Sequence, residues 1–208
     1  MSSIRRPSAS HRAGFTILEL MVVMVIIGIL MAAFVFSGAS IFRDAVVRRA
    51  QTQMTQLSAM LEEFRQIENI FPDDRLSRSI ATNVHNSGSE ALFLAFFDQG
   101  YSGRLPNQDW LVNTDNDVAR KSVTRLPNRD LFEIGDPWGN PVVYFYSLHY
   151  EDVQTVIAGA DGFMEEQNVR AARNETTGAF VAPTGFQLIS AGQDGEFGTE
   201  DDLLSYGG

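Results

Sequence analysis

Residues 15–36 read FTILELMVVMVIIGILMAAFVF, an apolar run whose only charged residue is Glu19. A helix needs about 20 apolar residues to cross the hydrocarbon core of a bilayer, so this run predicts a transmembrane helix. The residues before it include Arg5, Arg6 and Arg12 and no acid. Because positively charged flanks stay in the cytoplasm, we expect the N-terminus there and the rest of the chain on the outer side of the membrane.

Glu19 bears on three competing fates of this segment: a cleaved secretory signal, a plain membrane anchor, or a precursor cut before the apolar run. A charged side chain in the hydrocarbon core costs on the order of 2.5–3.5 kcal/mol on insertion scales, so Glu19 should have a partner. A cut between Gly14 and Phe15 would create an amino group at Phe15. Glu19 of a neighbouring subunit could pair with it, which would favour assembly and set the register.

The residues Gly14, Phe15, Thr16 and Glu19, in GFTILELMVVMVIIGILMAA, resemble the class III signal of type IV pilins and pseudopilins. The resemblance implies that a prepilin peptidase removes the leader, residues 1–14, and methylates the new N-terminus at Phe15, and that Glu19 acts in assembly. It implies partners as well: copies of the chain in a helical filament, other pseudopilins and an inner-membrane assembly platform. The small residues 37–40 would instead suit a conventional signal peptidase.

The helical pattern continues through residues 37–71, where apolar residues recur at three- and four-residue steps and predict an amphipathic helix. Pro72 ends the pattern. This face comprises Val46, Val47, Ala50, Met54, Leu57, Met60, Leu61, Phe64 and Ile67. We therefore expect an α+β fold of the type IV pilin-like kind, in which one long helix, transmembrane in its first half, packs on a small antiparallel sheet in a head formed by residues 72–208.

Within the head, residues 142–146, 153–157 and 186–190 predict strands, and residues 89–97 predict a short buried helix capped by Ser89. Residues 113–117 (NTDND) resemble the start of an EF-hand loop, but the required glycine and distal glutamate are missing, so a solvated loop is expected. The turn DPWGNP at residues 136–141, followed by an aromatic strand, resembles the heads of major pseudopilins of type II secretion. Its expected role is structural, with Trp138 anchoring the turn on the core.

The C-terminal segment, residues 190–202, reads SAGQDGEFGTEDD and crowds its carboxylates together, while no lysine or arginine follows Arg173. Oxygen ligands without cysteine or histidine favour calcium. The loop also resembles the calcium-binding loop of major pseudopilins. This implies Asp194 and Asp202 as the better ligands, Asp201 and Glu200 as alternatives, and assisting carbonyls near residues 189 and 192. An acidic solvated turn is the alternative. The shorter sequence at residues 158–166 predicts a hairpin turn.

Charge and composition exclude several other functions. The chain carries 16 basic and 26 acidic residues, so removal of the three leader arginines leaves 13 against 26, a net charge of -13. Such a surface would repel phosphate backbones, and no nucleic-acid partner is expected. The chain has no cysteine. No nucleophile with its base, paired acid and base, or histidine spacing typical of a metal site is visible, so we expect no enzyme activity.

These patterns favour a structural subunit of the pseudopilus of a type II secretion system, stabilised by Ca²⁺. Before assembly it would be a single-pass protein of the bacterial inner membrane, in contact with lipid, with a periplasmic head. Two alternatives stay open: a type IV pilus subunit for adhesion, motility or DNA uptake, and an exported calcium-binding domain that works alone.

Overall fold

The computed structural model describes residues 15–208, with the side chains of residues 15–32 and 42–208. The predicted leader, residues 1–14, lies outside the described residues, and so does Gly14. The chain divides into two compact units, one that ends at Asp44 and one from Ala45 to Gly208. The second unit begins earlier than the head expected from the sequence, residues 72–208, and is called the head from here on.

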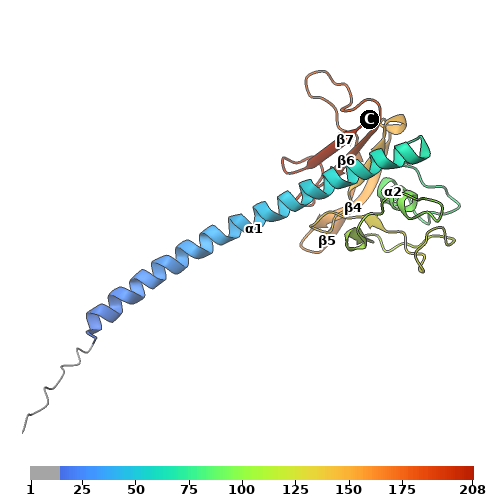
Figure 1. Ribbon diagram of the computed structural model, residues 1–208. Coiled ribbons are helices and arrows are strands. Elements are labelled where there is room, and N and C mark those ends of the chain that lie inside the picture. The colour runs from blue at the N-terminus through green and yellow to red at the C-terminus, as the bar shows by residue number, and fades with distance from the viewer. Residues whose placement is uncertain (1–14) are drawn as a thin grey trace, which may run out of the picture. The chain divides into compact units, whose positions relative to one another are not determined.

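Helix α1 comprises residues Ile17–Glu68 (Figure 1). The long N-terminal helix expected from the sequence is thus confirmed. A search of the described residues finds no helix with the length and apolarity needed to cross a membrane. The transmembrane character of the first half stays a prediction.

The part of α1 that belongs to the head packs through one apolar face. Ala50, Leu57 and Leu61 are at most 1% exposed, and Phe64 stacks on Tyr101 with ring centroids 5.0 Å apart. Ile67, near the end of the helix, is 39% exposed. The three- and four-residue spacing therefore predicted the buried face correctly from Ala50 to Phe64, whereas Val46 and Val47 before it are only half-buried.

Strands in the described part of the chain form three antiparallel sheets. The strands are β1 (Leu111–Val112) with β2 (Glu133–Ile134); β3 (Val143–Tyr146), β6 (Phe186–Ser190) and β7 (Leu203–Gly207) in the order β3-β6-β7; and β4 (Val153–Ala160) with β5 (Phe163–Arg170). The three strands predicted from the sequence correspond to β3, β4 and β6, and β4 is longer than expected.

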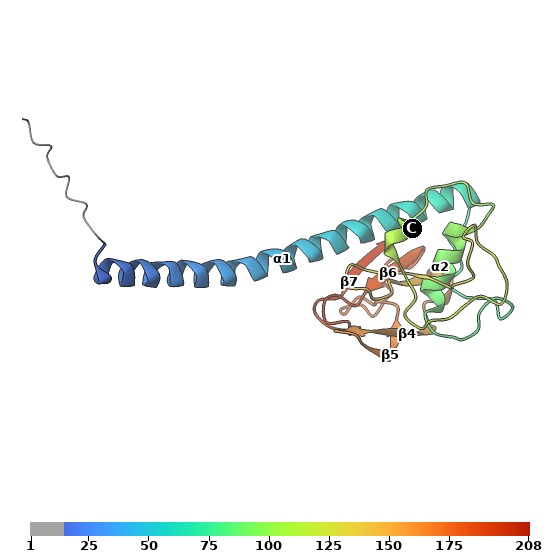
Figure 2. The same cartoon turned by 90° about the horizontal axis from the view of Figure 1, so that it is seen from below.

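The three-stranded sheet of β3, β6 and β7, called the central sheet here, has a hydrophobic core on each face. Successive side chains of a strand point to opposite sides of the sheet. Tyr144, Phe186 and Leu188 face the core shared with α1. Val143 and Ile189 face a second core shared with the hairpin of β4 and β5. Figure 2 shows this layering within the head, with the α1 segment, the sheet of β6 and β7, and the β4–β5 hairpin in succession.

Helix α2 (Ser87–Phe97) is buried along most of its length, as the sequence predicted. The predicted serine cap is wrong. The helix is preceded by Asn86 in the left-handed conformation (φ 53°), and Asn86 makes no side-chain capping bond. The Ser89 hydroxyl instead accepts a hydrogen bond from the backbone N–H of Ile134 in β2, at 3.1 Å. Ser89 therefore makes a tertiary contact with β2 and does not cap the helix.

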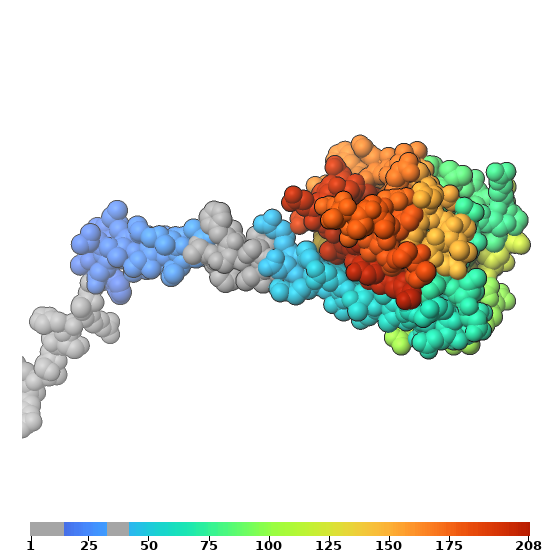
Figure 3. Space-filling view, turned by 90° about the horizontal axis from the view of Figure 1, so that it is seen from above, coloured from blue at the N-terminus to red at the C-terminus, as the bar shows by residue number. Residues whose placement is uncertain are grey.

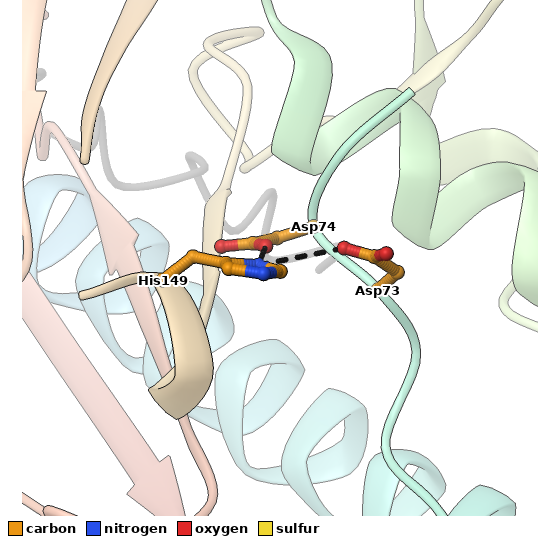
Figure 4. A group of neighbouring side chains, drawn as sticks. All are labelled: Asp73, Asp74 and His149. Carbon is orange, nitrogen blue, oxygen red and sulfur yellow. Dashed lines mark hydrogen bonds and ion pairs between the residues drawn. The ribbon is translucent and has the colours of Figure 1, made fainter. Parts of the chain in front are cut away.

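The segment after α1 is tied to the central sheet by Asp74, which is 3% exposed. Its carboxylate accepts hydrogen bonds from the backbone N–H of Tyr146 and from Nδ1 of His149. Asp73 Oδ1 lies 3.5 Å from the same ring nitrogen (Figure 4). The Tyr144 hydroxyl donates to the Pro72 carbonyl at 2.7 Å. His149 lies in a 3₁₀ helix (Ser147–His149), and its bond to Asp74 joins this helix to the segment after α1.

Candidate functional site

The first functional feature is the start of α1, where Thr16 and Glu19 bond to each other. The Glu19 backbone N–H donates to Thr16 Oγ1 at 3.2 Å, and the Thr16 backbone N–H donates to Glu19 Oε2 at 3.0 Å. This is a capping box, in which a threonine and the glutamate three residues later satisfy each other's free N–H groups. The Thr-x-x-Glu spacing of a capping box is visible in the sequence, yet the only partner expected for Glu19 was on another subunit.

The residues that follow expose an apolar surface. Every large apolar side chain between Phe15 and Met31 is at least 45% exposed, and Phe15 itself is 81% exposed. A helix that is apolar all around belongs in a membrane or in a bundle of other helices. An exposed apolar surface of this length in a single chain marks an interaction site.

The second feature is the acidic loop between β6 and β7, which is organised around Asp201. Its Oδ2 accepts hydrogen bonds from the backbone N–H groups of Gln193 (2.6 Å) and Asp194 (3.1 Å), and Thr199 Oγ1 donates to its Oδ1 at 2.7 Å. Partial burial acts to raise the pKa of Asp201, but these hydrogen bonds outweigh it, and the net shift is downward.

Asp202 differs from Asp201 because one of its oxygens has no partner. Its Oδ2 accepts from the Gly198 backbone N–H at 2.7 Å, whereas its Oδ1 is buried without a hydrogen bond. Burial, assisted by the charges of Asp201 and Asp194, raises the pKa of Asp202. A hard cation bound here would coordinate this oxygen and neutralise the neighbouring negative charges.

The remaining predicted ligands are less enclosed. Asp194 is exposed and accepts a bond from the Glu196 backbone N–H at 2.9 Å, and Glu200 is exposed. Two groups of described residues bring three acidic or histidine ligand atoms within 4.8 Å of one another, and neither lies in this loop. The predicted carboxylates therefore lie in one loop, but no three of them bring ligand oxygens within 4.8 Å of one another. Any ion there would need backbone carbonyls as well.

Three segments that are separate in the sequence come together around this loop. The Asp136 carboxylate of the DPWGNP turn accepts from Ser190 Oγ at 2.6 Å, and Asn140 Oδ1 accepts from the Gly159 backbone N–H at 2.9 Å. Gln167 of β5 donates to the Gly195 carbonyl at 2.8 Å. Figure 3 shows the C-terminal part of the chain, in orange and red, on one face of the head.

A surface pocket of about 600 Å³ lies between these segments. Trp138, expected to anchor its turn on the core, is instead half-buried and lines this pocket. The turn at Asp161 and Gly162, with φ of 53° and 84°, also borders it and closes the β4–β5 hairpin predicted from the sequence. The lining residues are Trp138, Gly159, Ala160, Asp161, Gln193, Asp194 and Asp201.

Comparison with known proteins bears directly on the N-terminal feature. Residues 9–35 match the family described as the prokaryotic N-terminal methylation motif. The resemblance to type IV pilin-like proteins is confirmed. The pilin-like signal includes Phe15, Thr16 and Glu19, so the capping box lies inside the matched residues.

Similarity to proteins of type II secretion extends over the rest of the chain. The type II secretion system core protein G of Escherichia coli (strain K12) is 25% identical over 200 residues, which cover 96% of this chain and 94% of that protein. The protein of the same name from Aeromonas hydrophila is 27% identical over 125 residues, covering 60% of this chain and 83% of that protein. No solved structure matches the chain. The expectation of a structural protein with no enzyme activity is confirmed by these similarities.

Proposed function

We propose that this chain is a structural subunit of a type IV pilus-like filament, the pseudopilus of a type II secretion system. The observation that carries the proposal is the pilin-like signal joined to a helix whose described apolar side chains, from Phe15 to Met31, are all exposed. The partners are copies of the same chain, other pseudopilins and an inner-membrane assembly platform. The similarity to core protein G over nearly the whole chain favours secretion over a true pilus.

Processing is the first step of the proposed pathway. A prepilin peptidase cuts between Gly14 and Phe15 and methylates the new amino group. Before assembly, residues 15–36 lie in the inner membrane, with the arginine-rich leader in the cytoplasm and the head in the periplasm. In the filament, the same apolar surface packs against other copies.

The capping box gives Glu19 two roles. Within one subunit it satisfies the Thr16 backbone N–H, which lowers the cost of placing a carboxylate in the membrane. In the filament its charge pairs with the Phe15 amino group of a neighbour, because that cation exists only after cleavage. The capping bond needs a hydrogen-bond acceptor, whereas the pairing between subunits needs a negative charge.

Glu19→Gln separates these roles, because glutamine still serves in a capping box but carries no charge. We expect this variant to insert into the membrane and to fail in filament assembly. Thr16→Ala removes the cap and leaves the charge, at a cost of about 1 kcal/mol of helix stability, and should still assemble. Filaments of Glu19→Gln in normal amounts, assayed by shearing and immunoblotting, would refute the charge pairing.

The acidic loop is proposed as a calcium site that stiffens the head. Its donor set contains only oxygens, and the buried Oδ1 of Asp202 is left without a partner, which suits a hard cation. Asp202, Asp194 and Asp201 would hold the ion together with backbone carbonyls, and Glu200, which is exposed, is an alternative. Calcium would neutralise the repulsion between these carboxylates and fix the loop against the DPWGNP turn.

Deletion of the gene distinguishes the proposed function from its alternatives. We expect enzymes normally found in the medium to accumulate in the periplasm, while surface pili are unaffected. Loss of surface pili with normal secretion would instead assign the chain to a type IV pilus. If neither changes, the chain would be an exported domain that works alone.

A further inference from the structure

A second acidic cluster lies in the head, away from the C-terminal loop. Glu90 belongs to the first turn of α2, and Asp115 and Asp117 belong to the NTDND segment that precedes β2. One carboxylate oxygen of each of these three residues lies within 4.8 Å of the other two. The two segments are far apart in sequence, so only the fold brings these acids together.

Two of the three cluster residues are buried and Asp115 is half-buried. The expectation of a solvated loop at residues 113–117 is therefore wrong at Asp117, although Asn116 is exposed. Glu90 is 1% exposed and Asp117 is 7% exposed. Oε1 of Glu90 and Oδ1 of Asp117 are buried and accept no hydrogen bond. An unpartnered buried carboxylate oxygen is costly and calls for a ligand, an ion or a proton.

The surrounding groups hold the two aspartates in place but provide little positive charge. The charge of His85 acts to lower the pKa of Asp117, but burial and the charge of Asp115 have larger effects, and the net shift is upward. Asn83 Nδ2 donates to Asp115 Oδ2 at 2.7 Å, and Thr82 Oγ1 donates to Asp117 Oδ2 at 3.0 Å. Among the described side chains, none of the ion pairs involves a cluster residue. The start of α2 offers a partial charge of only about +0.5, against three carboxylates.

A further buried acid, Glu133, lies nearby and adds to the negative charge. It is 0% exposed, and its two oxygens accept from Asn86 Nδ2 (2.7 Å) and the Thr114 backbone N–H (3.1 Å).

Burial, together with Asp117 and Asp115, raises the pKa of Glu90 to about 10. A negative charge on Glu90 is therefore unfavourable in this environment unless a positive charge is bound beside it.

We propose that Glu90, Asp115 and Asp117 bind a divalent cation, Ca²⁺, inside the head. The spacing fits, because two ligands on opposite sides of a calcium ion lie about 4.6–5.2 Å apart when each bond is 2.3–2.6 Å. Oxygen ligands with no histidine or cysteine favour calcium or magnesium, and the burial of Glu90 and Asp117 favours calcium, since magnesium keeps several waters. The ion would fix α2 to the polar segment before β2.

This site is independent of the calcium site proposed in the C-terminal loop, so the test removes that loop's contribution first. The full-length chain carrying Asp194→Asn and Asp202→Asn is purified in detergent and freed of metal by chelation. Equilibrium dialysis with radioactive calcium should show one ion bound per chain. Adding Glu90→Gln should abolish this binding, whereas the exposed substitution Glu175→Gln should leave it unchanged.

Thermal unfolding gives a second readout on the same proteins. Calcium at about 100 times its dissociation constant should raise Tm by roughly 5–10 °C in the loop variant, and the rise should vanish with Glu90→Gln. If Glu90→Gln does not fold, Asp115→Asn, at a less buried position, serves in its place. Failure of the loop variant to bind calcium at millimolar concentration would overturn the proposal and leave shared protons as the neutralising charge. Filament assembly enters neither readout.

Discussion

Ser190 Oγ donates a hydrogen bond to Asp136 Oδ2 at 2.6 Å, and this buried contact joins the end of β6 to the DPWGNP turn. The other oxygen of Asp136 accepts from the backbone N–H groups of Trp138 (2.9 Å) and Asn140 (3.0 Å). One carboxylate thus shapes its own turn and positions the residue from which the acidic loop departs. The position of the loop on the head therefore depends on this turn as well as on the loop's own sequence.

Asp136→Ala should therefore destabilise the head by roughly 1–3 kcal/mol, because it leaves buried donors without an acceptor. Asp136→Asn keeps one acceptor oxygen for the turn and should recover most of this stability. Urea unfolding of the two variants and the parent chain measures the difference. An Ala variant as stable as the parent would show that the turn does not depend on this carboxylate.

Two glycines of the acidic loop should respond differently to alanine. Gly195 and Gly198 both have positive φ, 71° and 91°. A Cβ on Gly195 would lie 2.3 Å from the Gly159 backbone, whereas a Cβ on Gly198 would meet nothing within 4 Å. We expect about 1–2 kcal/mol of backbone strain from Gly198→Ala and a clearly larger loss from Gly195→Ala. Equal losses, measured by urea unfolding, would contradict the packing of the loop on the hairpin.

Glu133 should make the head less stable as pH rises, when calcium is chelated. Burial, followed by the charge of Asp115, raises the pKa of Glu133 from 4.5 to about 8. The folded protein then keeps a proton that the unfolded chain releases. Its contribution to stability is complete below pH 4.5 and falls towards pH 8, by at most about 1.4 kcal/mol per pH unit.

Glu133→Gln is the matched control for this titration, since the amide resembles the protonated acid and does not titrate. Urea unfolding at several pH values between 5 and 8 should give a flatter profile for Glu133→Gln than for the parent chain. Parallel profiles would mean that Glu133 titrates alike in the folded and unfolded states.

The C-terminal loop predicts a separate response to calcium. Asp202→Asn removes the charge of the residue with the orphaned oxygen and should reduce calcium-dependent stabilisation of the head without removing the part due to Glu90. The change in Tm on adding calcium to the metal-free chain measures this. An unchanged Tm response would exclude Asp202 from the ligands.

Periodic and local features of this fold could be predicted from sequence, because their causes lie within a few residues. The buried face of α1 follows from helical spacing, and the Asp161–Gly162 turn follows from residues that tolerate positive φ. The capping box of Thr16 and Glu19 was equally local. It was missed because the glutamate was considered only as a partner for another subunit.

Long-range features could not be predicted in the same way. Glu90 lies in an apolar helix and Asp117 in a polar segment, and neither pattern indicates that their carboxylates meet. Trp138 likewise reads as a core residue because of its size, yet the fold places it beside the acidic loop. In both cases tertiary packing determines the environment of the side chain, and the pattern of a single sequence does not indicate that packing.

The N-terminus of the protein in its own cells tests the central claim most directly. Intact-mass and N-terminal peptide analysis of the chain purified from bacterial membranes should give a protein that begins at Phe15 with one methyl group on its amino nitrogen. A chain that still begins at Met1, or one cut after the apolar run, would have no free amino group beside Glu19 and would contradict assembly as a pilin-like subunit.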